Sequence, residues 1–207
     1  MDEISAELSR RFKEVDEIIK LVVALEQQAY SHSDSRSAPV MKAVVLLMLY
    51  NCIEGVMYQC FECLFDSISD HCEDCNDLEP SAYKQYQKYW DRKQETVNGK
   101  PQVEFSDYIE LCHIFSGNLD ARRIRDILKE WGIQADFHCS RPEEEHRLLA
   151  IKSRRNSLAH GDKSFSEVGR VFAASEIRQF ADITRIYLES VIDVFDNYIQ
   201  QQRFVKQ

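Results

Sequence analysis

Residues 39–69 are the stretch that most constrains how this chain can fold. The first half, "VMKAVVLLMLY", is apolar on nearly every side, and Asn51 and Glu54 follow it directly. A helix that is apolar all round has to be enclosed by other elements, so the stretch predicts a central buried helix. Because Asn51 and Glu54 interrupt the run before it reaches the length of a membrane span, we expect a soluble protein without a membrane partner.

The spacing of the remaining apolar residues predicts an all-α fold. Only six glycines and four prolines punctuate 207 residues, and apolar positions mostly recur at intervals of three and four. This pattern is typical of long helices. We expect one domain, residues 1–207, with a bundle of four long core helices: three at about 3–30, 39–69 and 142–161, and a last one that Ser175 caps and whose buried stripe runs from Ile177 to Tyr198.

A helical segment at about 70–131 is expected to be inserted between the core helices. Within it we predict helices at about 81–97 and 105–115, followed by one that Asn118 or Asp120 caps and Gly132 closes.

The cysteines favour a reducing compartment. Seven thiols, an odd number, argue against a disulfide framework, so we expect a cytoplasmic protein. Cys60-x-x-Cys63 and Cys72-x-x-Cys75 could supply four thiolates to zinc. However, Cys60 and Cys63 fall on a helical row of apolar residues, and no glycine-bearing knuckle accompanies them. We therefore predict small core residues with no metal or cofactor, and a structural zinc is the less favoured alternative.

Basic residues gather around one histidine in an otherwise acidic chain. The formal net charge of −9 argues against a general nucleic-acid binder. Lys152, Arg154 and Lys163 nevertheless surround His160, and we predict that these three contact an RNA backbone.

The spacing of the motif "RRNSLAHG" suggests a chemistry. Asn156 and His160 lie four residues apart on one helical face, so the amide can orient the imidazole. Arg155 precedes His160 by a five-residue step that rises about 7 Å, so a single helix directs the two side chains poorly toward one atom. Two copies of the helix related by a twofold axis could instead present both groups to a shared cleft. A histidine that moves protons and an arginine that stabilises a phosphoryl intermediate suffice to cleave RNA through its 2′-hydroxyl without a metal. The alternative is electrostatic: Lys152, Arg154, Arg155 and His160 complement the helix dipole, with Gly161 as the left-handed cap.

The same motif resembles the R-x(4–6)-H signature of the HEPN superfamily. "LLMLYNCIEGVMYQ", "FSGNLDARRIRDILKEWGI" and "NSLAHGDKSFSEVGR" are similar to small stand-alone bacterial HEPN-like nucleases. The resemblance implies a HEPN-like bundle that forms a homodimer and acts as a metal-independent endoribonuclease, either as a toxin or in antiviral defence. Arg155 and His160 would be the catalytic pair, with Asn156 as the supporting polar residue. HEPN toxins with a nucleotidyltransferase antitoxin carry a tyrosine where this chain has Asp162, so that antitoxin is not expected.

Two further points stay open at this stage. Asn51 and Glu54 either support Arg155 or belong to a polar stripe on a solvated helix face. The chain is either an RNA-cleaving enzyme, with an RNA substrate and a cognate antitoxin or defence partner, or a catalytically silent HEPN-like module that binds a nucleotide, RNA or a partner protein. The intact pair of Arg155 and His160 favours the enzyme.

Overall fold

The computed structural model describes residues 1–29, 37–72, 75–90, 118–134 and 142–206. The helices of these ranges are α1 (Asp2–Ala29), α2 (Ser37–His71), the short 3-10 helix η1 (Cys75–Asp77), α3 (Pro80–Trp90), α5 (Ala121–Glu130), α6 (Pro142–Ala159), α7 (Phe165–Arg170) and α8 (Ala174–Gln200). An isolated bridge joins Leu78 to Val205, and no β-strand occurs among the described residues. The prediction of an all-α fold is therefore confirmed.

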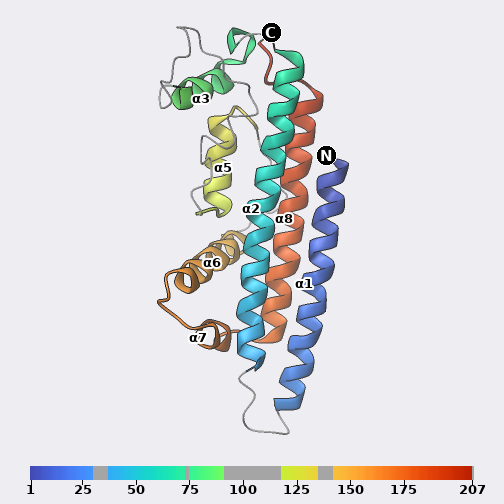
Figure 1. Ribbon diagram of the computed structural model, residues 1–207, viewed down its shortest axis with the longest axis vertical. Coiled ribbons are helices and arrows are strands. Elements are labelled where there is room, and N and C mark those ends of the chain that lie inside the picture. Colours follow the sequence, from blue (N-terminus) through green and yellow to red (C-terminus); the bar gives the residue numbers. More distant parts are fainter. Residues whose placement is uncertain (30–36, 73–74, 91–117, 135–141, 207) are drawn as a thin grey trace, which may run out of the picture.

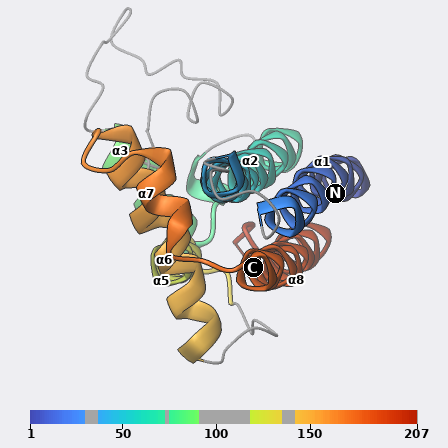
Figure 2. The ribbon, with the colours of Figure 1, turned by 90° about the horizontal axis from the view of Figure 1, so that it is seen from below.

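Helix α2 is the centre of the molecule. Figure 1 shows α1 and α8 packed along its length, with α8 parallel to α2 and α1 antiparallel to both. Viewed end on in Figure 2, the three helices form a triangle. Leu46, Leu49, Ile53 and Met57 of α2 are almost completely buried. Burying this much apolar surface is the main source of the bundle's stability.

By length and hydropathy, α2 also qualifies as a membrane span, which differs from the sequence-based expectation that Asn51 and Glu54 end the apolar run too early. Inside the described structure, 56% of its most apolar 18-residue window is buried. The core helix of a soluble protein passes the same test, so this single helix is weak evidence for a membrane.

A second group of helices lies against α2 on the side away from α1. Figure 1 shows α3 and α5 beside one half of α2, and α6 and α7 beside the other half. Leu148 and Ile151 of α6 are buried in the core, although the axis of α6 crosses α2 obliquely (Figure 1). Thus α6 presents one face to the core and leaves its C-terminal end at the surface.

Helix α5 is joined to the core by aromatic side chains. Trp131, at its C-terminus, packs against Phe61 of α2 with ring centroids 5.6 Å apart. The Tyr198 hydroxyl of α8 donates to the Trp131 carbonyl at 3.1 Å, and the Tyr187 hydroxyl donates to the Ala121 carbonyl at 3.3 Å. These contacts fix both ends of α5 relative to α8.

The boundary of the predicted insertion at residues 70–131 stays a prediction. The helix expected at 105–115 and the end of the one expected at 81–97 lie outside the described residues. The expected caps of α5 are present: the Asp120 carboxylate accepts a hydrogen bond from the Arg123 amide at 2.8 Å, and Gly132 has φ +74°.

Two local expectations were wrong or incomplete near the start of α8. The predicted cap, Ser175, lies inside the helix, which begins at Ala174. The cap residue is Ala173, and its backbone amide donates to the Glu176 carboxylate at 2.7 Å. The sequence reading also missed the short helix α7, although Ser164 and Glu167 form a capping box at its start.

Candidate functional site

The motif residues lie at the C-terminal end of α6. Backbone hydrogen bonds close the helix: the Asp162 and Lys163 amides donate to the Ser157 carbonyl at 2.9 and 3.3 Å, and the Gly161 amide donates to the Leu158 carbonyl at 3.2 Å. Gly161 adopts φ +73°, the left-handed conformation that this ending needs. His160 immediately precedes it and is exposed. The ending therefore fixes the backbone of His160 and leaves its imidazole open to a ligand.

The guanidinium of Arg155 is held from two sides. It lies over the ring of Tyr50 on α2, 4.7 Å from the centroid, and Nη1 donates to Asn156 Oδ1 at 3.1 Å. A cation at this distance from an aromatic face is attracted by the ring quadrupole. Arg155 is half-buried, so it is positioned by the protein and still reaches the surface.

Asn156 extends this arrangement to a distant segment. Its Nδ2 donates to Asn118 Oδ1 at 3.0 Å. Because a guanidinium can only donate, the oxygen of Asn156 must face Arg155 and the nitrogen must face Asn118. The Asn156 side chain thus bonds to Arg155 and Asn118, and the hydrogen bond between Asn156 and His160 is the ordinary helical one, in which the His160 backbone amide donates to the Asn156 carbonyl at 3.0 Å. Orientation of the imidazole by the Asn156 amide stays a prediction.

Tyr50 lies beneath Arg155 and is fully buried. Its hydroxyl accepts a hydrogen bond from the Leu119 amide at 3.2 Å. Burial raises the pKa of Tyr50 to about 12, the Leu119 amide opposes that rise, and the carboxylate of Glu54 adds to it. The phenol therefore stays protonated at neutral pH.

The two predicted supporting residues separate in the structure. The carboxylate of Glu54 helps to raise the pKa of the Tyr50 hydroxyl, so Glu54 belongs to the surroundings of Arg155. Asn51 is exposed and lines a different cavity, between α1 and α2, together with Glu7 and Arg11. A supporting role of Glu54 stays a prediction, and Asn51 lies beside α1.

The three predicted RNA contacts also differ from one another. Lys152 forms an ion pair with Asp120, the cap of α5. The guanidinium of Arg154 lies 5.7 Å from the ring centroid of Phe172, and its Nε is buried. Lys163 is exposed. Lys152 and Arg154 therefore have structural roles whether or not RNA touches them.

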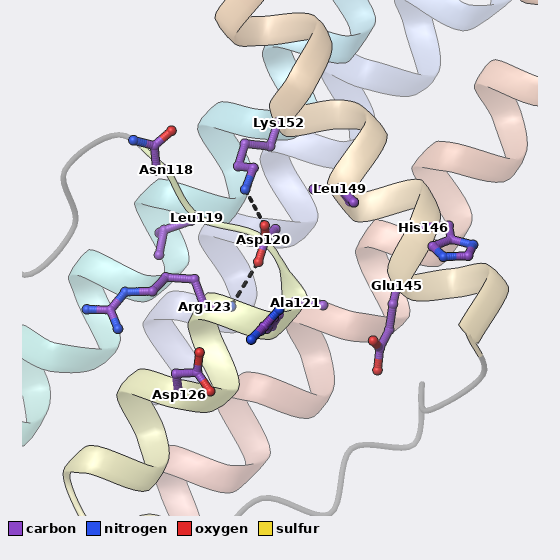
Figure 3. Close-up of a pocket in the computed structure, with 11 residues that line it drawn as sticks. Asn118, Leu119, Asp120, Ala121, Arg123, Asp126, Glu145, His146, Leu149 and Lys152 are labelled. Carbon is purple, nitrogen blue, oxygen red and sulfur yellow. Dashed lines mark hydrogen bonds and ion pairs between the residues drawn. The ribbon is translucent and has the colours of Figure 1, made fainter.

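A cavity of about 720 Å³ lies one to three turns before the motif, between α6 and the start of α5 (Figure 3). Figure 3 shows Lys152 directed toward Asp120, and Asn118 at one edge. The wall carries charges of both signs and is formed by Asn118, Leu119, Asp120, Ala121, Arg122, Arg123, Asp126, Glu145, His146, Leu149 and Lys152. Its balanced charge does not by itself favour an anion.

Helix geometry keeps Arg155 and His160 apart within one chain. Five residues rotate about 140° beyond a full turn and rise about 7.5 Å along the helix. The structure agrees, since Arg155 packs over Tyr50 toward α2 and His160 is exposed beyond the last turn. For Arg155 and His160 to act on one atom, the second group would have to come from another copy of α6. Within one chain, only a ligand long enough to span the separation could contact both.

The cysteines give no sign of a metal centre in the described part of the chain. No group of three or more histidine, cysteine or acidic side chains that could hold a metal occurs there. Cys52, Cys60 and Cys72 are buried free thiols. Burial raises the pKa of Cys52 to about 11 and that of Cys60 still further, so both are protonated at neutral pH.

Sequence reasoning missed the roles of Tyr50 and Asn118. Tyr50 looked like one more apolar member of the buried run in α2. Asn118 was expected only as an alternative cap, a role that Asp120 fills. Both contacts join segments distant in sequence, which periodicity cannot reveal.

The fold and the motif define the class of this protein. It is an all-α domain whose Arg-Asn-x-x-x-His-Gly sequence ends a helix, with the arginine held by the protein and the histidine exposed. Residues 1–204 match the model of the MAE_28990-like HEPN family. The chain belongs to this family of the HEPN superfamily, and the resemblance seen in the sequence is confirmed. No curated protein and no solved structure gave a significant match.

Proposed function

We propose that this HEPN protein is a metal-independent endoribonuclease. The observation that carries the proposal is the pairing of a positioned guanidinium with an exposed imidazole at one helix end, Arg155 over Tyr50 and His160 before Gly161. Nuclease or binding-module function is what membership of the family supports in general. Cleavage of RNA by these particular residues is our inference.

In the proposed reaction the 2′-oxygen of a ribose attacks the adjacent phosphorus. The bond to the 5′-oxygen of the next nucleotide breaks, which leaves a 2′,3′-cyclic phosphate and a 5′-hydroxyl. His160 takes the proton from the 2′-hydroxyl, and a protonated imidazole returns one to the leaving oxygen. Arg155 donates hydrogen bonds to the phosphoryl oxygens as negative charge grows on them.

We further propose that the active form is a homodimer with its motif helices at the interface. Arg155 and His160 of one helix point in different directions, but in a dimer the His160 of one protomer can face the Arg155 of the other. Phe165, the first residue of α7, and Val171, directly after its end, are exposed by 39% and 60% in the segment that follows the motif, and a dimer contact at this segment would cover them.

For its role in the cell, we propose a cytoplasmic toxin or antiviral effector, restrained by a cognate antitoxin or defence partner. The support is the family to which the chain belongs and a set of thiols suited to a reducing compartment.

Cleavage of a labelled mixed-sequence RNA in excess EDTA tests the enzymatic proposal. We expect Arg155→Ala to lower the cleavage rate about 10²- to 10³-fold and His160→Ala by about 10²- to 10⁴-fold. His71→Ala and Arg203→Ala, which alter exposed residues elsewhere, should cleave like the wild type. Equal rates for His160→Ala and the wild type would contradict the proposal.

Mixing two inactive variants tests the shared cleft. If the arginine of one protomer acts with the histidine of the other, a dimer of Arg155→Ala and His160→Ala retains one intact site. After denaturation and refolding together, about a quarter of wild-type activity should return, since half of the dimers are mixed and each has one site of two. No recovery in a verified mixed dimer would assign both groups to the same protomer.

One observation favours a second candidate, a silent module that binds nucleotide, RNA or a partner protein. Lys152 is ion-paired with Asp120 and Arg154 packs on Phe172, so two of the predicted phosphate contacts are engaged within the chain. A purified dimer that binds RNA without cleaving it, and loses binding on Arg155→Ala, would support that candidate.

A further inference from the structure

The segment formed by Asn118, Leu119 and Asp120 contacts α6 at successive turns, although it lies more than thirty residues away in sequence. Asn118 accepts from Asn156, and Asp120 pairs with Lys152 one turn earlier. Figure 3 shows Asn118 and Asp120 beside Lys152 at the edge of the cavity. The segment therefore spans the turn of α6 that carries Arg155.

Hydrogen-bond directions connect Asn118 to the guanidinium. Arg155 donates to Asn156 Oδ1 at 3.1 Å, and Asn156 Nδ2 donates to Asn118 Oδ1 at 3.0 Å. The guanidinium requires the Asn156 oxygen to face it, and the acceptor on Asn118 binds the other end of the same amide. Asn118 thus holds the Asn156 side chain, and through it the guanidinium, in place.

Tyr50 supplies the other constraint. Its ring lies 4.7 Å from the Arg155 guanidinium carbon, and its hydroxyl accepts the Leu119 amide at 3.2 Å. The ring therefore cannot turn away from Arg155 without leaving a buried amide unpaired. The same three-residue segment fixes both the ring under the guanidinium and the amide beside it.

We propose that Tyr50 and Asn118 are positioning residues of the RNA-cleavage site, which hold Arg155 in the orientation needed to bind the scissile phosphate. This inference rests on the proposed function. Neither residue touches the reacting atoms: Tyr50 acts through the guanidinium, and Asn118 acts through Asn156. Holding a charged donor in one rotamer lowers the reorganisation needed in the transition state.

The first test changes the acceptor at position 118. Asn118→Ala should lower kcat about tenfold with KM nearly unchanged, as expected for one neutral hydrogen bond that aligns a catalytic group. Asn118→Asp keeps an oxygen acceptor and should recover most of the rate. Asn197→Ala, on an exposed face of α8, is the matched control and should cleave like the wild type.

A double-mutant cycle asks whether Asn118 acts through Asn156. Asn118→Ala combined with Asn156→Ala should be no slower than Asn156→Ala alone, because the second change removes the residue through which the first acts. Additive losses of kcat would overturn the proposed chain from Asn118 to Arg155.

The ring and the hydroxyl of Tyr50 are separable. Tyr50→Phe keeps the ring and should lower kcat a few-fold, whereas Tyr50→Leu removes the ring and should lower it about tenfold or more. Tyr58→Phe, at an exposed position of the same helix, is the control. Equal kcat values for folded Tyr50→Leu and the wild type would overturn the role of the ring.

A readout that needs no cleavage keeps the inference distinct from the proposed function. In NMR, the Nη–H signals of Arg155, identified by their loss in Arg155→Lys, should exchange faster with water in Asn118→Ala than in the wild type or in Asn118→Asp. An unchanged signal would overturn the positioning role. If His160→Ala loses activity while Asn118→Ala keeps it in full, the positioning role is refuted and the proposed function stands. Full activity in His160→Ala would refute the proposed function itself.

Discussion

Asp120 should stabilise the start of α5 in two separable ways. Its Oδ1 accepts the Arg123 amide at 2.8 Å as the helix cap, and its Oδ2 pairs with Lys152. Both side chains of the pair are largely buried, with 21% exposure for Lys152 and 11% for Asp120. Removing one partner would therefore leave a charge with little access to water.

The size of the effect follows from these two contacts. Loss of a cap costs about 1 kcal/mol. Loss of a partly buried ion-pair partner costs about 1–2 kcal/mol more, less than the value for a fully buried pair. Asp120→Ala should thus lower the free energy of unfolding by about 2–3 kcal/mol, and the melting temperature by about 4–12 °C. Asp120→Asn keeps the cap and loses only the charge, so it should lose about half as much.

Chemical denaturation followed by circular dichroism at 222 nm measures the free energy of unfolding of both variants, with Asp126→Ala, at an exposed position of α5, as the control.

The charge of Asp120 also predicts a pH dependence. Burial raises the pKa of Asp120, but the Lys152 hydrogen bond and the Arg123 amide outweigh it and lower the pKa overall. A lowered pKa in the folded state stabilises the protein above the unfolded pKa of about 3.9, and the stabilisation is lost as pH falls below it. The difference between wild type and Asp120→Asn should therefore be constant near neutrality and shrink below about pH 4. Equal losses for Asp120→Asn and Asp120→Ala would refute the separation of cap and charge.

Three further variants or reagents test other parts of the account. Gly169→Ala should destabilise the protein by about 3 kcal/mol or more in the same assay, because a Cβ would lie 1.7 Å from the Pro39 carbonyl oxygen; a loss below 1 kcal/mol would contradict this close approach. Gly161→Ala should cost only about 1 kcal/mol, since φ is +73° but nothing lies within 4 Å of the added Cβ; a much larger loss would show an unseen contact. Cys60 should resist a thiol reagent at pH 8 until the protein unfolds, because burial raises its pKa; rapid native labelling by mass spectrometry would contradict its burial.

Much of the fold could be predicted because local patterns determine it. The apolar run of α2 and the periodic stripe of α1 place those two helices within a few residues of their observed ends, and the stripe of α8 places that helix within a few residues of its observed start. Caps were less predictable, since Ser175 and Glu176 offer competing ways to begin α8 and the glutamate forms the observed contact. The short helix α7 was missed because six residues carry too little periodicity to stand out.

The site was predictable only in part, for a similar reason. Arg155, Asn156 and His160 lie within one helical turn and a half, so their spacing is visible in sequence. Their partners come from α2 and from the segment before α5, and only the folded chain brings Tyr50 and Asn118 to them. The ion pair of Lys152 with Asp120 was hidden in the same way.

The central claim is that the 2′-hydroxyl of RNA is the nucleophile and that His160 takes part in its attack. The most direct measurement compares an RNA oligomer with several mapped cut sites and the same oligomer with a single 2′-deoxynucleotide at one of them, both in EDTA. The account predicts that cleavage is lost at the deoxy position alone and continues at the other sites with 2′,3′-cyclic phosphate ends. Continued cleavage at the deoxy position would contradict it.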